Sequence, residues 1–440
     1  MKLLTFQGGV HPYDGKELSK DQPIKELKPG KELAFLVSQH IGAPAKPCVE
    51  KGDRVLAGQK IAEAGGFVSA PIFSSVSGTV KGIEKRKNAP GGMVDAIIVE
   101  NDEQYETVEF SPINSLDDLS NEEIVGRIKD AGVVGMGGAG FPTHVKLSPK
   151  DPSKIDYILV NGAECEPYLT SDYRSMIEMP EKIVQGLRCI LKLFDSAKGV
   201  IAIENNKPEA IRIMQEAVKG ESRMSVAVMQ TKYPEGAERC LISAITGREV
   251  NSKMLPADAG CIVDNISTLI AVNDAVMLGK PLYHRVFTIT GEAIANPSNF
   301  DVLVGQSYSE IVAAAGGFKS QPEKIISGGP MMGFAQSDLT VPVTKTSGAI
   351  TAFLTDPVSK TQESACINCG RCVSGCPARL MPCKLSDYAE HGDAERFEAE
   401  FGLECVNCGS CSFQCPAKRP LAANINTMRQ TVLANKRKKK

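Results

Sequence analysis

Two short cysteine-rich runs near the carboxyl end constrain this chain more than any other feature. Both have the spacing Cys-x-x-Cys-x-x-Cys-x-x-x-Cys-Pro; the first contains Cys366, Cys369, Cys372 and Cys376, and the second contains Cys405, Cys408, Cys411 and Cys415. This is the bacterial spacing for a 4Fe–4S cluster, in which three closely spaced thiolates surround one face of the cluster. The sequence therefore predicts two 4Fe–4S clusters.

The fourth cysteine of each run is expected to bind a different cluster from the first three. In two-cluster modules it binds the other cluster. We therefore predict one cluster on Cys366, Cys369, Cys372 and Cys415, and the other on Cys405, Cys408, Cys411 and Cys376. Two zinc sites or a disulfide knot are the alternatives, but zinc sites use Cys-x-x-Cys pairs that lie well apart in the sequence.

Length and composition exclude several classes of protein. A chain of 440 residues is expected to form two to four domains. A net charge of −2, 5% aromatic residues and no Trp argue against a nucleic-acid partner. The first residues do not have the apolar stretch of a signal peptide, and no run reaches the roughly 20 apolar residues of a membrane span. Oxygen-sensitive clusters and scattered free thiols predict a reducing cytoplasm.

The amino-terminal third is predicted to contain an extended arm (1–28) and a small β domain (29–105). In the β domain, short apolar strands are interrupted by glycine turns at Gly52 and Gly58. The arrangement resembles the biotinyl/lipoyl-type barrel-sandwich hybrid. Members that carry a prosthetic group have a lysine on the central hairpin, where this chain has Gly65-Gly66-Phe67. We therefore interpret the domain as structural or docking.

The next region (115–280) alternates strands and helices, which predicts a Rossmann-like α/β layer with a parallel sheet. A capping box at Ser120 begins a helix, and a glycine loop then runs from Gly135 to Lys146. Such a loop lets a ligand approach the backbone, although a packing loop is the alternative. Polar turns follow three expected strands, beginning at Asn161, Tyr233 and Asp264, and ligands of parallel sheets gather at such strand ends.

The remaining chain is predicted to contain a β-grasp domain (283–345), a linker (346–362), a two-cluster ferredoxin-like helical domain (363–425) and a basic tail (426–440). The whole is thus a multidomain protein of α/β and α+β parts. We expect the five basic residues from Lys436 to Lys440 to form a solvated end, with contact to acidic lipid or a partner as the alternative.

Taken together, these stretches resemble the C subunits of the Rnf complexes, with an SLBB-type β-grasp domain. The middle region is similar to the NADH-binding flavoprotein subunit of complex I. The resemblance implies FMN- and NADH-binding residues within the glycine loop and the three polar turns: Gly135, Gly137, Gly138, Gly140, Phe141, Lys146, Asn161, Glu164, Glu166, Tyr233, Gly236, Glu238, Asp264, Asn265 and Thr268.

The chain departs from the flavoprotein pattern at four places. Met136 replaces the usual arginine, Ala163 and Ala237 replace acidic residues, and Asp264 replaces the first asparagine of a pair. Loss of a cation and gain of an anion beside the flavin are expected to weaken FMN binding or alter its potential.

The resemblance implies an electron-transfer subunit that exchanges electrons between NAD(H), FMN and the two clusters. Phe141 and Glu166 are expected at the NADH position, with no side chain acting as acid or base. The implied partners are the other Rnf subunits, including its iron–sulfur and flavin membrane subunits, with ferredoxin reached indirectly. The implied location is the cytoplasmic face of the bacterial membrane. Two alternatives are a cobalamin reductase of propanediol-using microcompartments and a non-enzymatic iron–sulfur relay without FMN.

Overall fold

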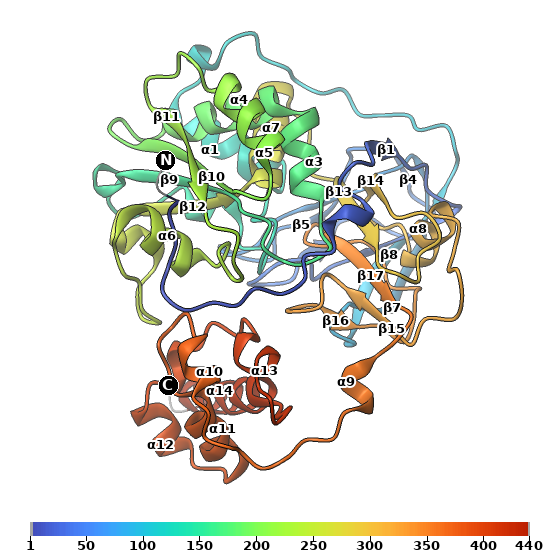
Figure 1. Ribbon diagram of the computed structural model, residues 1–440. Coiled ribbons are helices and arrows are strands. Elements are labelled where there is room, and N and C mark those ends of the chain that lie inside the picture. Colours follow the sequence, from blue (N-terminus) through green and yellow to red (C-terminus); the bar gives the residue numbers. More distant parts are fainter. Residues whose placement is uncertain (1–2, 439–440) are drawn as a thin grey trace.

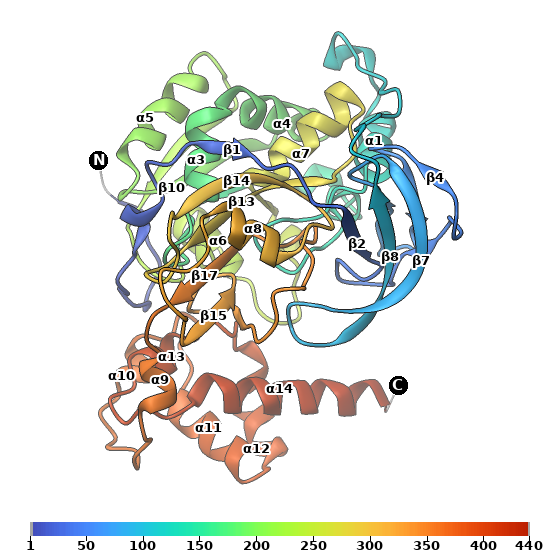
Figure 2. The same cartoon turned by 90° about the vertical axis from the view of Figure 1, so that its right-hand side faces the viewer.

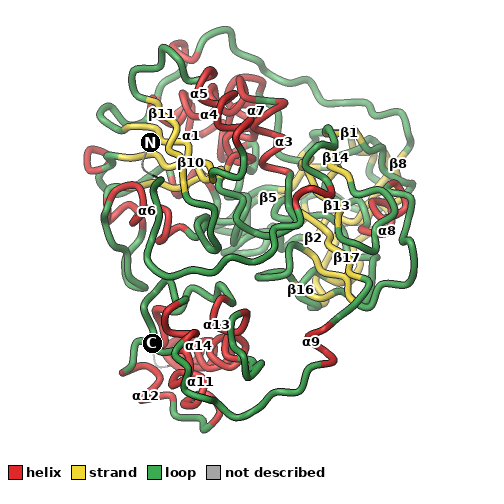
Figure 3. The backbone as a smooth tube through the Cα atoms, in the orientation of Figure 1, coloured by secondary structure: helices red, strands yellow, loops and turns green. Residues whose placement is uncertain are grey.

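The computed structural model describes residues 3–438, which form a broad body and a smaller helical module below it (Figure 1). Most helices of the body gather around β10 (Lys198–Glu204) and β11 (Met224–Met229) in one part of it, whereas the other part consists mainly of strands and loops (Figure 3). In residues 3–438 no helix is both long enough and apolar enough to cross a membrane.

Two small sheets pack face to face in the amino-terminal third. One has the strand order β2-β8-β7-β4 and the other has the order β3-β5-β6. Their shared core contains Leu33, Phe35, Ile61, Ile72 and Ile97, which are all fully or almost fully buried. The strands are β2 (Glu32–Leu36), β3 (Lys46–Pro47), β4 (Arg54–Val55), β5 (Lys60–Glu63), β6 (Ile72–Phe73), β7 (Gly78–Lys87) and β8 (Met93–Asn101).

The middle region contains a four-stranded parallel sheet with the order β11-β10-β9-β12. Numbered along the chain this order is 3-2-1-4, the arrangement of a Rossmann-like half, and its switch point lies between β9 and β12. The strands are β9 (Tyr157–Gly162), β10 (Lys198–Glu204), β11 (Met224–Met229) and β12 (Cys261–Asn265).

Seven helices accompany this sheet. The predicted capping box begins α1, because Ser120 and Glu123 each accept the other's backbone N–H. Helix α7 is apolar on nearly all sides and lies buried against α4. The helices are α1 (Asn121–Asp130), α2 (Thr143–Lys146), α3 (Ser171–Glu178), α4 (Pro180–Lys192), α5 (Pro208–Ala217), α6 (Glu238–Thr246) and α7 (Ile266–Leu278).

A mixed six-stranded sheet, with the order β1-β14-β13-β17-β15-β16, forms the third part of the body. It corrects two predicted boundaries. Strand β1 comes from the predicted arm and β17 from the predicted linker, so neither segment is wholly irregular. The elements are β1 (Ile24–Glu26), β13 (His284–Thr290), β14 (Ser298–Leu303), α8 (Tyr308–Ala314), β15 (Lys324–Ser327), β16 (Phe334–Ala335) and β17 (Ala349–Phe353).

Helix α9 (Pro357–Lys360) leads to the helical module, which contains both cysteine runs. Its last helix, α14, begins within the predicted cluster domain and continues through most of the predicted basic tail. That tail boundary is therefore wrong, and the helix projects from the module in Figure 2. The helices are α10 (Arg371–Ser374), α11 (Pro382–Glu390), α12 (Ala394–Ala399), α13 (Ser410–Phe413) and α14 (Leu421–Lys438).

Candidate functional site

The glycine loop lies at the switch point of the parallel sheet. The amide of Met136 donates to Thr268 Oγ1 (2.9 Å) at the start of α7, and Gly137 lies against the side chain of Asn265. A side chain on Gly137 would lie about 3.0 Å from Asn265, and the φ of +82° already favours glycine there. The loop is therefore joined to the carboxyl end of β12.

The crest of this loop is open to solvent. Gly137, Gly138 and Ala139 are exposed, and a Cβ placed on Gly138 would meet nothing within 4 Å. The N–H groups of these three residues make no hydrogen bond to the part of the chain that the structure describes. Free backbone N–H groups beside the first turn of α7 are a suitable environment for an anionic group such as a phosphate.

Lys146 lies beside this loop. Its ammonium donates to the carbonyl of Val263 (2.7 Å) and to Asp264 Oδ1 (3.0 Å). An ammonium has three donors, so one remains for a ligand. The second oxygen of Asp264 is buried and has no hydrogen-bond partner among residues 3–438. Desolvation raises the pKa of Glu238; the charge of Lys146 opposes this rise and the charge of Asp264 adds to it. Asp264, one of the departures from the family pattern, thus pairs with the expected lysine.

Asn161 connects the end of β9 to the turn that begins at Tyr233. Its amide donates to the carbonyl of Gly236 (2.8 Å), and its oxygen accepts the amide of Ala163. The structure therefore gathers these predicted residues at one end of the sheet: Gly135, Gly137, Gly138, Lys146, Asn161, Gly236, Glu238, Asp264, Asn265 and Thr268.

Gly140 and Phe141 end the loop. Gly140 has a φ of +70° and lies against Thr346 and the backbone at His40, where a Cβ would come within 2.7 Å of Thr346. The carbonyl of partly exposed Phe141 accepts the amide of Gly135 (2.8 Å), which closes the base of the loop.

Two further predicted residues, both carboxylates, contact neighbouring elements. Glu164 accepts the amides of Asp172 (2.7 Å) and Tyr173 at the start of α3. Glu166 Oε1 accepts the amide of Met331 (2.7 Å) from the loop between β15 and β16. Burial raises the pKa of both carboxyls to about 7.

Met136 does not face the open side of the loop. It is buried, and with Ser267, Ile270 and Arg285 it lines a separate cavity of about 220 Å³ behind the loop. The residue at the family's arginine position therefore lies among core side chains and not at the crest of the glycine loop.

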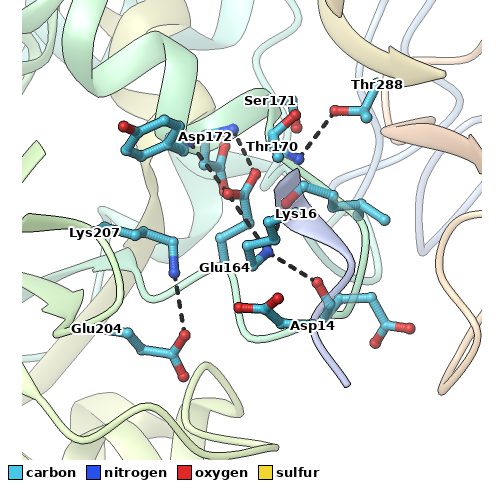
Figure 4. Close-up of polar contacts among 12 residues, drawn as sticks. Asp14, Lys16, Glu164, Thr170, Ser171, Asp172, Glu204, Lys207 and Thr288 are labelled. Carbon is cyan, nitrogen blue, oxygen red and sulfur yellow. Dashed lines mark hydrogen bonds and ion pairs between the residues drawn. The ribbon is translucent and has the colours of Figure 1, made fainter. Parts of the chain in front are cut away.

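Sequence reasoning missed a buried charge network under the 161–170 turn (Figure 4). Lys16, from the arm, donates to the carbonyls of Glu166 and Leu169 (2.6 Å) and lies 3.8 Å from Glu164. Lys207 donates to the carbonyl of Ala163 (2.6 Å) and pairs with Glu204. These charges come from distant segments, so no local pattern in the sequence indicates them.

One cavity of the helical module is lined by Cys376, Cys405, Cys408 and Cys411, which we call the inner set. Cys376 comes from the first run and the others from the second. The outer set is Cys366, Cys369, Cys372 and Cys415; within it Cys372 and Cys415 share a small apolar cluster, whereas Cys366 and Cys369 are exposed. The fourth cysteine of each run thus lies with the other run.

No group of three or more His, Cys, Asp or Glu side chains in residues 3–438 is arranged to hold a single metal ion. A cubane needs a different arrangement, because each cysteine binds a different iron and the four sulfurs surround a cavity. The four-cysteine lining of the inner cavity fits that requirement.

Comparison with known families identifies a chain with three recognised domains. Residues 4–104 match the RnfC barrel sandwich hybrid domain, residues 128–274 the Nuo51 FMN-binding domain, and residues 286–335 the SLBB domain. Two crystal structures of an NAD+-reducing nickel–iron hydrogenase have TM-scores of 0.50 and 0.51 at 18% and 19% identity, a likeness of fold alone. This chain spans 63% and 68% of those chains, and 74% and 75% of it is covered.

Curated relatives are similar over most of the chain. The C subunit of the proton-translocating ferredoxin:NAD(+) oxidoreductase complex of Clostridium ljungdahlii is 47% identical over 403 residues, which cover 91% of this chain and 88% of the relative. The C subunit of the Na(+)-translocating complex of Acetobacterium woodii is 42% identical over 436 residues, with 99% and 98% covered. The chain belongs to this family of C subunits.

Proposed function

We propose that this chain is the electron-transfer subunit of an ion-translocating ferredoxin:NAD(+) oxidoreductase complex, and that it carries electrons between NAD(H), FMN and two 4Fe–4S clusters. The named relatives support the reaction, and the match to the Nuo51 FMN-binding domain supports the flavin. One contact carries the proposal: the Tyr233 hydroxyl, from the turn beside the glycine loop, donates to the carbonyl of Cys408 in the inner set (2.7 Å).

The glycine loop and its surroundings are suited to FMN. Exposed backbone N–H groups, the first turn of α7 and the remaining donor of Lys146 would hold its phosphate and polar ring edge. Gly137 and Gly138 leave the backbone accessible because neither has a side chain. Asp264 lowers the net positive charge of this seat, which favours weaker FMN binding than in a site with the usual asparagine.

When bound, FMN would supply the chemistry that joins the two kinds of carrier, because a flavin can accept a hydride from NADH and release the two electrons one at a time. The chain itself orients the reactants. Phe141 would provide an apolar face for the nicotinamide, and Glu166 would bind a polar group of NADH. The amide of Met331 fixes that carboxylate, and Gly329 allows its approach, since a Cβ there would lie 2.4 Å from Glu166.

The two cysteine sets would act in order. The inner set would bind the cluster nearer to the flavin, because Cys408 contacts the Tyr233 turn and Gly409 lies against Met331. The outer set would bind the second cluster. Exposed Cys366 and Cys369 put that cluster close to solvent, where a partner subunit with its own iron–sulfur or flavin carrier would receive the electrons. We place the chain at the cytoplasmic face of the membrane.

Spectroscopy of anaerobically purified protein, loaded with FMN, iron and sulfide, tests this function. We expect NADH to bleach the flavin band and then the cluster absorbance, and to support ferricyanide reduction. Lys146→Ala should lose most of both effects, whereas Lys150→Ala, an exposed lysine just beyond α2, should retain them. A protein that binds no FMN and does not respond to NADH would contradict the proposal and favour a relay.

A further inference from the structure

The N-terminal arm, residues 3–23 in the structure, lies between the α/β domain and the cysteine module. Figure 1 shows it as the blue segment that follows the lower edge of the body, above the orange and red module. Hydrogen bonds connect it to both sides, so it is part of their interface.

On the side of the α/β domain, the arm pairs with the end of β11 and with the backbone that follows it. The amide of Leu4 donates to Val228 (3.1 Å), and Val10 and Tyr233 exchange both of their backbone hydrogen bonds (2.8 and 2.9 Å). The buried ammonium of Lys232 donates to the carbonyl of Phe6 (2.6 Å) and lies 4.1 Å from the centre of its ring. The arm is thus fixed beside the turn that contacts Cys408.

On the side of the cysteine module, two glycines make the contact. The amide of Gly9 donates to the carbonyl of Gly375 (3.0 Å), the residue before Cys376. Gly8 and Gly9 both have a φ of +84°, which favours glycine. A Cβ on Gly8 would lie 2.7 Å from the carbonyl oxygen of Cys376, and one on Gly9 would lie 2.8 Å from that of Tyr233.

Two members of the inner set are therefore held from outside their own module. Cys376 rests against Gly8, and Cys408 accepts the Tyr233 hydroxyl and packs with Val10. Without the arm, Cys376 would lose its contact with Gly8, and Cys408 would lose its contact with Val10.

We propose that the Gly8-Gly9 segment is a positioning element that sets the separation between the flavin seat and the inner cluster, and so sets the rate of electron transfer between them. The proposal rests on the function proposed above. Electron tunnelling weakens steeply with distance, so a small outward shift of the module slows this step. Hydride transfer from NADH takes place at the glycine loop and does not depend on the shift.

Rapid mixing of the fully loaded protein with NADH separates the two steps. Stopped-flow absorbance follows flavin bleaching, and freeze-quench EPR follows cluster reduction. In Gly9→Ala we expect flavin bleaching at the parent rate and measurably slower cluster reduction, because tunnelling weakens as the separation of the two carriers grows. Gly52→Ala is the matched control, because Gly52 has a φ of +97° and no atom within 4 Å of a built Cβ.

If Gly9→Ala does not fold, a second variant still tests the proposal. Lys232→Met removes the anchor of Phe6 without backbone strain and should also slow only cluster reduction. Equal slowing of both steps, unchanged cluster reduction in both variants, or the same effect in Gly52→Ala would overturn the proposal. Failure of the parent protein to bleach with NADH would instead overturn the proposed function. Amide exchange then tests the positioning alone: it should rise around Cys376 and Cys408 in Gly9→Ala, and unchanged exchange would refute it.

Discussion

The two cysteine runs have identical spacing in the sequence, but the two sets of cysteines that they form have different surroundings in the structure. The inner set lines one cavity and is supported by the arm and the Tyr233 turn. The outer set has two exposed members, Cys366 and Cys369, and Cys366 lies close to Arg419 of its own module. The spacing of each run therefore predicts the same cofactor for both sites, whereas contacts with distant segments make the two predicted sites different.

Removal of one ligand from each set should have the largest effect. Cys408→Ser should abolish the inner cluster and, with it, reduction of the outer cluster by NADH. Cys369→Ser should abolish the outer cluster but leave the inner one reducible by NADH. Iron content and EPR after NADH or dithionite check both variants. Reduction of the outer cluster by NADH in Cys408→Ser would contradict the inner-to-outer order.

Lys146→Ala should affect both cluster sites equally, since it acts before the electrons reach either. Loss of charge-assisted hydrogen bonds in a partly buried site weakens binding by about 1.5–3 kcal/mol, or roughly tenfold to a hundredfold in FMN affinity. Fluorescence titration with FMN measures the change. Dithionite should still reduce both clusters; unchanged FMN affinity would show that Lys146 serves only the buried ion pair with Asp264.

Glu235 is expected to make the stability of the folded protein depend on pH. Its side chain is fully buried, and this burial raises its pKa to about 8, although the charge of Lys232 and a contact with Thr5 oppose the shift. Between pH 4.5 and 8 the folded state keeps a proton that the unfolded state has lost, so stability falls as pH rises. Glu235→Gln should remove this fall and be more stable than the parent above pH 8, on the order of 1–2 kcal/mol.

Anaerobic denaturant unfolding at pH 5 and pH 8.5 measures this difference. Glu216→Gln is a suitable control because its side chain is largely exposed on α5. Equal stability differences at both pH values for Glu235→Gln would argue against a protonated carboxyl at position 235.

Tyr233→Phe should have the smallest effect, and only on the inner set. It removes one hydrogen bond to the Cys408 carbonyl, worth about 1 kcal/mol. Potentiometric EPR titration should show a shift of the inner cluster potential and no shift of the outer one. A shift of both potentials would indicate that the Tyr233 contact orients the whole module.

Patterns within short stretches of sequence were sufficient to predict the elements that depend only on neighbouring residues. The capping box at Ser120 and the strand expected before Asn161 are confirmed, because their signals lie within a few neighbouring residues. Strand β17 was not predicted within the linker, because a five-residue strand between turn residues is recognised only through its partners β13 and β15. In α14, Leu421, Ile425, Met428 and Val432 do recur at helical spacing, so that signal was available.

The candidate site also combines residues that local motifs predict with contacts between distant segments that they do not predict. Lys146, Asn161 and Thr268 were predicted from motifs, and the structure gathers them at the switch point. The role of the arm was not predictable, because the contacts of Gly8 and Gly9 lie more than 200 residues away in the sequence, at Tyr233 and Cys376. In the sequence, the Gly8-Gly9 pair was the only sign that the backbone of the arm makes close contacts.

The contact of Gly8 with Cys376 also has a consequence for the order of folding. It joins two segments that lie far apart in the sequence, and such contacts form late because loop closure costs entropy before the contact repays it. The bond of Gly9 to Gly375 also requires that the helical module has folded first. Closure of the arm onto the module is thus expected to be a late event in refolding, after the arm has paired with β11.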